Sequence, residues 1–370
     1  MSNELFIDDR TTRHRKLGAL TAIVVILTVL SLFVDGGLGG FFDPGEVFAS
    51  YGLWFQQTIA SISSPDQVLS AGDILAQHHA YYRIINRVGI TLMTVLCGAV
   101  LAIAGSLYQS AFRNPIASPS MLGVSSAIQL GDVIVVMIFG MAAPASLGWR
   151  YLICYVCVIV VMTVLFGLSY LMTGKGRPLN VVNLLLTAMI LTQIIGVIVT
   201  YVTAFVFSWE QWEIYNNLSE ALTVNTSAFG WGALLVTCLI GIIPIFLLRF
   251  RLNGLNFDDM EMKLLGIDAG RLRLLALICG TILVMGVQVQ MGVVAMLALV
   301  VPHISRMVFG AEFRKQLAGN VLIGASLLVL CRVILGFIPF ISSFLPISVV
   351  LNFLVLPFFV WMLATQQRGW

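Results

Sequence analysis

Ten apolar segments, each long enough to cross a bilayer as a helix, are the feature that most constrains this 370-residue chain. They cover residues 17–34, 84–107, 122–143, 149–172, 180–207, 228–249, 271–290, 292–309, 316–336 and 346–365. Charged residues make up 10% of the chain, whereas a soluble domain carries about 25%. One soluble core cannot bury so many apolar side chains. The sequence therefore predicts an all-α polytopic membrane protein with about ten transmembrane helices.

The distribution of basic residues tests this layout, because cytoplasmic loops carry an excess of lysine and arginine. With the N-terminus inside, only Arg83, Arg87, Arg150 and Arg332 fall on outer segments, which leaves 16 of the 20 basic residues inside. A wrong number of spans would scramble this asymmetry. We therefore predict cytoplasmic N- and C-termini, a cytoplasmic tail over residues 1–16, and a single transmembrane domain over 17–370.

Two connections on the outer side are long enough to have structure of their own. Residues 35–83 form a long extracytoplasmic loop that is expected to include a short interfacial helix. Residues 208–227 contain Trp209 and Trp212 beside acidic residues. The two tryptophans predict an aromatic belt at the membrane interface; the alternative is a docking or substrate-access surface.

A third connection, residues 250–271, lies on the cytoplasmic side and mixes charged with regularly spaced apolar residues. This spacing predicts short amphipathic helices bounded by Gly254, Gly266 and Gly270. A free cytoplasmic loop would not need an apolar face. The segment is therefore either a docking helix for a partner protein or a helix that lies on the lipid surface.

Motifs for catalysis and for cofactors are missing. Nothing matches the phosphate-binding loop G-x-x-x-x-G-K-[ST], and no cluster of metal ligands is present. The pair His78-His79 could ligate iron or haem, but a solvated dipeptide is the simpler interpretation. The six cysteines all lie in apolar segments and are expected to serve packing. We predict no enzyme activity, no metal or cofactor bound by this chain, and no nucleic-acid partner.

Polar residues within the spans are costly to bury and are often functional. Asp132 could line an aqueous cavity or carry a proton; alternatively, it reaches a partner or water near the inner half of its helix. Other residues that could line a transport pathway are Thr187, Thr192, Gln193 and Asn352. None of these residues forms the dense acidic relay of a proton-coupled pump.

The strongest motif lies between residues 98 and 123. Eleven residues together form one pattern of residue types at fixed spacing: Gly98, Leu101, Ala104, Gly105, Gln109, Asn114, Pro115, Ala117, Pro119, Leu122 and Gly123. The pattern resembles the signature of the FecCD-type permease subunits of type II ABC importers for ferric siderophores, haem and vitamin B12. Two further stretches agree with the resemblance: "LVVPHISRM", which contains Pro302 and His303, and "LLGIDAGRLR" in the cytoplasmic segment.

This resemblance implies the type II importer architecture and a set of partners. They are a second permease subunit, identical or related, two ATPase subunits that hold ATP and Mg, an extracytoplasmic substrate-binding protein, and the lipid of a prokaryotic plasma membrane. The resemblance places coupling to the ATPase on Asp258, Asp259, Met260, Lys263, Leu264, Leu265 and Gly266. It places docking of the binding protein on Arg83, Arg87 and Arg332.

Elementary physics accounts for several signature residues. Gly98 and Gly105 are seven residues apart, so they share a helix face and allow close packing. Asn114-Pro115 ends the helix at the cytoplasmic edge, since proline lacks an N–H and disfavours a helical residue before it. Pro119 keeps the connector irregular and Gly123 begins the next helix in close packing. Pro302 is expected to bend its span, and His303 is expected to be structural.

Several positions depart from the family pattern. Arg83 and Arg87 are four residues apart with no proline between them, and Arg332 and Gly336 stand where the family often has Asp-x-x-x-Arg. The leading hypothesis is an importer permease for an iron chelate, a ferric siderophore or haem, with a corrinoid next. A self-sufficient ion-coupled carrier, which Asp132 keeps open, and a scaffold subunit that has lost transport are the alternatives from other classes.

Overall fold

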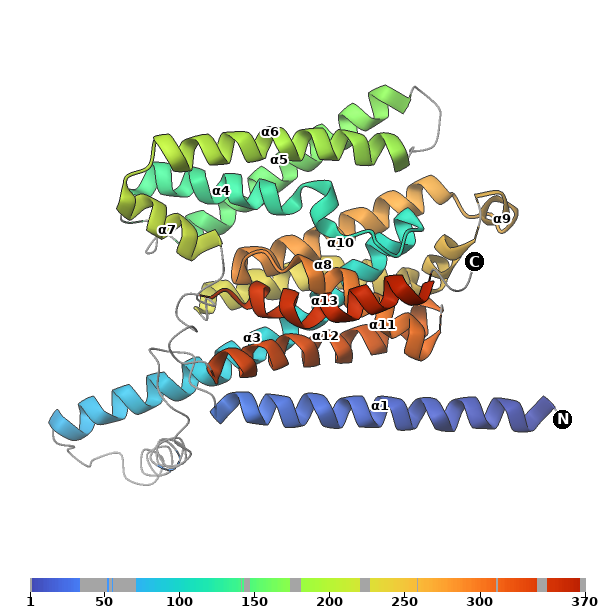
Figure 1. Ribbon diagram of the computed structural model, residues 1–370, viewed down its shortest axis with the longest axis horizontal. Coiled ribbons are helices and arrows are strands. Elements are labelled where there is room, and N and C mark those ends of the chain that lie inside the picture. The colour runs from blue at the N-terminus through green and yellow to red at the C-terminus, as the bar shows by residue number, and fades with distance from the viewer. Residues whose placement is uncertain are drawn as a thin grey trace.

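The computed structural model describes residues 2–33, 71–140, 142, 147–173, 181–219, 227–257, 259–310, 312–337 and 345–366, together with Gly52 and Phe55. Within these residues every regular element is a helix (Figure 1). The elements are α1 (Ser2–Phe33), α3 (Ala71–Phe112), η1 (Pro119–Leu122), α4 (Val124–Phe139), α5 (Leu147–Thr173), α6 (Val181–Phe205), α7 (Trp209–Ser219), α8 (Ala228–Leu252), η3 (Asn253–Asn256), α9 (Asp259–Leu264), α10 (Ala269–Met291), α11 (Ala295–Phe309), α12 (Phe313–Gly336) and α13 (Ile347–Gln366).

The helices reproduce the predicted spans. Seven described helices are long and apolar enough to cross a membrane, namely α1, α3, α5, α6, α8, α10 and α12. The three remaining predicted spans coincide with the shorter apolar helices α4, α11 and α13. The all-α polytopic fold is thus confirmed, while the number of helices that cross the bilayer stays a prediction.

Several segments outside the predicted spans are also helical, among them α7 and α9, and two others extend predicted spans. The helix α1 begins at Ser2, so the predicted tail 1–16 continues the first span, and α3 begins at Ala71, inside the predicted loop 35–83. From residue 73 to residue 88 the sequence contains neither glycine nor proline, so nothing local ends the helix there. Apart from Gly52 and Phe55, residues 34–70 lie outside the described part of the chain.

The core of the molecule is built around α3 and α10. The helix α3 packs against α10, α11, α12 and α1, and α10 also packs against α8 and α4. Of the residues in the most apolar 18-residue stretch of each helix, 78% are buried in α10 and 67% in α3. In α1 the corresponding share is 6%. In Figure 1, α4, α5, α6 and α7 lie together on one side of these central helices, and α1 lies along the opposite edge.

Small residues bring the central helices together, as the sequence predicts. A Cβ atom on Gly98 would lie 2.9 Å from the carbonyl carbon of Gly324 in α12. One on Gly105 would lie 2.9 Å from the Cα of Ala298 in α11. Any larger side chain at either position would therefore push two helices apart.

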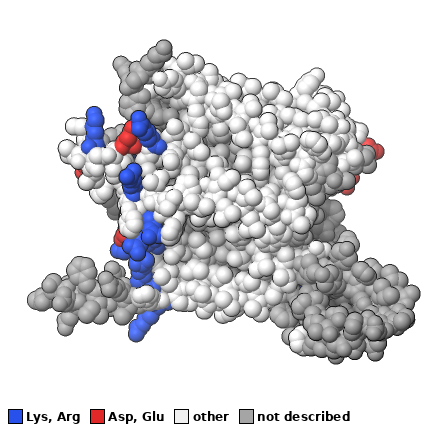
Figure 2. All heavy atoms as spheres, turned by 180° about the vertical axis from the view of Figure 1, so that it is seen from behind, with Lys and Arg blue, Asp and Glu red and all other residues white. Residues whose placement is uncertain are grey.

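Charge is distributed unequally along the molecule. In Figure 2 the lysine and arginine side chains form a band at one end of the visible face, where a few acidic side chains lie among them, whereas only acidic side chains appear at the opposite end. The basic end is the one at which Figure 1 places α9 and both termini, while α7 lies at the other end. This arrangement agrees with the positive-inside pattern of the sequence; the orientation of the termini in the membrane stays a prediction.

Candidate functional site

The predicted coupling segment folds as a compact elbow at the basic end of the molecule. The helix α8 ends at Leu252, η3 follows directly, and α9 occupies Asp259–Leu264. Gly266 then adopts a left-handed conformation, with φ of 70°, and the side chain of Asp268 accepts a hydrogen bond from the Arg271 amide to cap α10. We call the described residues 253–257 and 259–268 the coupling elbow.

The outer face of the coupling elbow is apolar and exposed. Leu264 is 89% exposed, and Met260, Leu265 and Phe257 are also exposed. Lys263 and Glu261 are exposed between them. Of the other predicted coupling residues, Gly266 is exposed at the turn, Asp259 begins α9, and Asp258 lies outside the described residues. Four exposed large apolar side chains on one short segment at the basic end are typical of a contact site.

The inner face of the coupling elbow is fixed to the rest of the protein. Leu255 and Met262 are completely buried. The Ile267 amide donates to the carbonyl of Met262 over 2.9 Å, and the Phe313 amide at the start of α12 donates to Asn253 Oδ1 over 2.8 Å. The exposed apolar residues therefore stand on a rigid base instead of a free loop.

Arg113 joins the coupling elbow to the signature motif. It follows the last residue of α3 and is the one described residue other than glycine with a positive φ, 50°. Its Nε donates to the carbonyl of Leu255 over 3.2 Å, and its Nη2 donates to the carbonyl of Phe257 and contacts the Met262 sulfur at 3.8 Å. Sequence reasoning placed Arg113 at the helix break but did not find this role, because its partners lie more than 140 residues away.

The connector between α3 and α4, residues 113–123, has the irregular backbone that the sequence predicts. The Asn114 amide donates to the carbonyl of Gln109 over 3.1 Å, and the Ile116 amide donates to Asn114 Oδ1 over 3.0 Å. The side chain of Gln109 in turn donates to the carbonyl of Leu299 in α11 over 2.8 Å. Hydrogen bonds thus replace the helical pattern that Pro115 interrupts.

The far end of the connector touches α6. The buried Pro119 begins η1, and Gly123 follows it with φ of 77°. A Cβ atom at Gly123 would lie 2.7 Å from Thr192 Oγ1, so glycine is required both by its conformation and by the close approach. The signature motif and one predicted pathway residue are therefore in direct contact.

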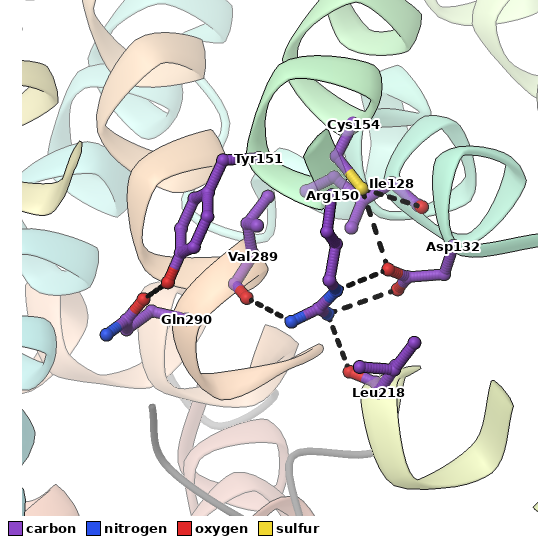
Figure 3. Close-up of polar contacts among 8 residues, drawn as sticks. All are labelled: Ile128, Asp132, Arg150, Tyr151, Cys154, Leu218, Val289 and Gln290. Atoms are coloured by element: carbon purple, nitrogen blue, oxygen red, sulfur yellow. Dashed lines mark hydrogen bonds and ion pairs between the residues drawn. The ribbon is translucent and has the colours of Figure 1, made fainter. Parts of the chain in front are cut away.

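A buried ion pair (Figure 3) lies beside α7, which Figure 1 places at the end opposite α9. Asp132 in α4 is completely buried, and its Oδ1 accepts from Arg150 Nε in α5 over 2.7 Å. Arg150 also donates to the carbonyls of Val289 and Leu218, over 3.0 and 2.8 Å. Those two carbonyls lie in the last turns of α10 and α7, where helices have no internal donors left. One guanidinium thus joins four helices.

Further polar contacts surround this ion pair. The Cys154 thiol donates to Asp132 Oδ1 over 3.5 Å, and the Tyr151 hydroxyl donates to Gln290 Oε1. Asp132 therefore reaches a partner, Arg150, and does not lie in the cavity that we describe below. In the sequence Arg150 is recognisable only as an outer basic residue, since no local pattern indicates a partner 18 positions earlier.

The remaining predicted pathway residues do not form one cluster. Thr187 is buried in α6 and donates to the carbonyl of Asn183 over 2.7 Å, while Gln193, on the same helix, is exposed. Asn352 in α13 lines a half-open, mostly apolar cavity of about 300 Å³ beside α11. The other lining residues are Met296, Val349, Phe353, Val355, Leu356 and Phe359.

The structure places the other predicted residues as follows. Arg87 in α3 and Arg332 in α12 are half-buried, and the side chain of Arg83 lies outside the described part. Pro302 lies inside α11, and the His303 ring meets Phe358 of α13 edge-on at 6.5 Å between centroids. Among the described residues no group of three or more His, Cys, Asp or Glu side chains could hold a metal ion.

Comparison with known proteins agrees with this geometry. The sequence model of the FecCD transport family matches residues 47–365. A "Probable iron chelatin transport system permease protein" of Helicobacter pylori is 30% identical, over 75% of this chain and 80% of that protein. The hemin transport system permease protein HmuU of Yersinia pestis is 29% identical, over 75% and 81% of the two chains. The vitamin B12 import system permease protein BtuC of Salmonella typhi is 29% identical, over 84% and 92%.

A solved structure shares the fold. It is described as an inward-facing conformation of a protein assigned to the metal-chelate type of ABC transporter, and it covers 95% of this chain and 99% of its own. The TM-score is 0.72 at 21% sequence identity. The match of the family model over most of the chain, with the signature motif and helical fold in place, identifies the chain as a member of the FecCD transport family, whose members are permeases of ABC importers for iron chelates, haem or vitamin B12.

Proposed function

We propose that this chain forms the translocation pathway of an ATP-driven importer for an iron chelate, a ferric siderophore or haem, and that the coupling elbow is the docking site for its ATPase. The observation that carries the docking part is the exposed apolar face of α9 on its rigid, buried base. The permease itself has no catalytic step, and ATP and Mg belong to the ATPase subunits.

The composition of α9 favours a protein partner over the lipid surface. The helix has six residues, and its sequence, "DMEMKL", contains two acids and one lysine. Helices that lie on membranes are rich in basic residues on the polar face, because the cytoplasmic leaflet is anionic. A short helix with net negative charge, rigidly held, instead matches the requirements of a preformed protein contact.

The assembly that we propose contains a second permease subunit, two ATPase subunits and an extracytoplasmic substrate-binding protein. The exposed apolar residues of α6 and α13, among them Val197 and Phe353, are then available to lipid or to the second permease. Arg87 and Arg332 stay the candidates for contact with the binding protein, together with Arg83.

The cargo proposal is supported by the names of the relatives. Two proteins at 30% and 29% identity are named for iron chelatin and one at 29% for hemin. A corrinoid cargo is the second candidate, since the vitamin B12 permease at 29% identity matches a larger share of the chain.

Substitution in α9 tests the docking site. Leu264→Asp places a charge at a side chain that is 89% exposed, so it should leave folding intact and abolish co-purification of co-expressed ATPase subunits. Leu264→Met, which keeps an apolar side chain, is the matched control and should retain them. Undiminished recovery of ATPase with Leu264→Asp would show that the docking site lies elsewhere.

A further inference from the structure

Arg113 donates hydrogen bonds from the connector, residues 113–123, to the coupling elbow. Its guanidinium donates to the carbonyls of Leu255, in η3, and of Phe257, which follows η3 and precedes α9. A guanidinium donates in a fixed fork and keeps its charge, and hydrogen bonds from a charged donor are roughly twice as strong as neutral ones. A movement of this turn therefore acts on Arg113 directly.

The connector carries such a movement toward α6 and α11. Residues 113–117 are tied to the end of α3 by the bonds from Asn114 to Gln109, and Gln109 is bonded to Leu299 in α11. The following turn, η1, packs against α4, α6, α10 and α11. Gly123 closes the connector against Thr192 with no room for a side chain. Contacts are thus continuous from α9 to Thr192.

The backbone of Arg113 shows that this arrangement is maintained at a cost. Its φ of 50° lies in the left-handed region, which residues other than glycine, asparagine and aspartate rarely adopt. A glycine at this position, directly after a helix, would end α3 with less strain. The arginine side chain therefore offsets an unfavourable backbone conformation through its contacts with the coupling elbow.

We propose that Arg113 is the positioning residue that transmits movement of the ATPase-docked coupling elbow to the connector and to α6. The inference rests on the proposed docking of an ATPase at α9, and it assigns to one side chain the link between that docking site and the pathway. Such a link is a coupling free energy between two sites, so it is measurable as a loss of response at one site when the other changes.

Arg113→Gly is the informative variant, because glycine suits the left-handed backbone while the whole side chain, guanidinium included, is removed. Arg113→Lys keeps the cation but lacks the fork, and it should show an intermediate effect. Arg271→Ala is the matched control, since Arg271 is a cytoplasmic arginine whose side chain is 89% exposed. All variants are prepared as the complete complex with ATPase subunits in lipid nanodiscs.

Amide hydrogen exchange is compared between ADP-bound and ATP–vanadate-trapped complexes. In the wild type, trapping should change exchange in both residues 259–268 and residues 113–123. In Arg113→Gly the change at 259–268 should persist, while the change at 113–123 should fall about tenfold. Arg271→Ala should behave as the wild type. If Arg113 had a merely structural role, Arg113→Gly would lower the thermal stability of the complex and leave the response of the connector to trapping intact.

Two results would overturn the inference. One is a connector in the wild type that does not respond to trapping although 259–268 does; the other is an Arg113→Gly complex whose connector responds as fully as the wild type. If the wild type retains no ATPase and residues 259–268 do not respond, the proposed docking site fails instead. The two failures are therefore distinguishable.

Discussion

At the scale of single residues, Asp132 is a carboxylate that the structure buries completely. A carboxylate with no exposed surface is costly unless it is paired and hydrogen-bonded. Arg150 provides both the opposite charge and the hydrogen bond, and its remaining N–H groups donate to carbonyls at the ends of α7 and α10. The pair therefore makes the positions of four helices depend on one another.

Breaking this pair should destabilise the protein strongly. We expect Arg150→Met to lower the free energy of unfolding by about 3–5 kcal/mol, because it leaves a buried carboxylate without a cation. The double variant Asp132→Leu/Arg150→Met should recover part of the loss, since no charge remains buried. Denaturant unfolding in detergent measures both variants.

The surface pair between Arg271 and Asp268 provides the control for that measurement. Its arginine side chain is 89% exposed and its carboxylate 56% exposed. We expect Arg271→Ala to change the free energy of unfolding by no more than about 0.5 kcal/mol. If Arg150→Met were as mild, the ion pair would not hold the four helices together.

At the scale of elements, the central helix α3 owes its close neighbours to two glycines. Gly98 meets the α12 backbone and Gly105 meets the α11 backbone. Without a hydrophobic driving force inside lipid, helices associate through such close packing and through interhelical hydrogen bonds. Tyr108 adds one of these bonds, between its hydroxyl and Thr281 of α10, over 2.7 Å.

A methyl group at Gly105 should disrupt this packing. In Gly105→Ala the Cβ would lie 2.7 Å from the carbonyl carbon of Ala298, which belongs to the backbone and cannot rotate away. We expect a loss of about 1–3 kcal/mol in unfolding free energy. Gly167→Ala in α5, where nothing lies within 4 Å, should be neutral or stabilising, since alanine favours helices. Equal effects of the two substitutions would contradict this packing role.

At the scale of the whole molecule, the apolar segments and the charge asymmetry describe a multi-pass inner-membrane protein of a prokaryote. The basic band lies at the end that carries the coupling elbow (Figure 2). Docking of an ATPase requires that this end be cytoplasmic. Fold, charge and proposed partner are thus consistent with one orientation.

The sequence predicts the helices well and their long-range polar contacts poorly. Apolar length predicted the ten apolar helices among the described residues but not α7, and the signature motif predicted the break at Asn114-Pro115 and the close packing at Gly98 and Gly105. These features depend on local composition or on backbone rules. The partners of Arg113 and Arg150 depend instead on which helices pack together, which no single segment encodes. The extension of α3 back to Ala71 was missed because an apolar segment indicates which residues can lie in the membrane, and a helix can continue beyond them.

Uptake by the reconstituted complex tests the central claim most directly. Proteoliposomes that contain this chain with its ATPase subunits are given the binding protein and a labelled ferric siderophore, haem or cobalamin. We predict uptake of an iron chelate that requires ATP, is unaffected by ion gradients, and is lost with Leu264→Asp. Uptake of cobalamin alone would show that the cargo is a corrinoid and would leave the proposed ATP-driven mechanism unchanged. Uptake by this chain without an ATPase, driven by an ion gradient, would contradict the account.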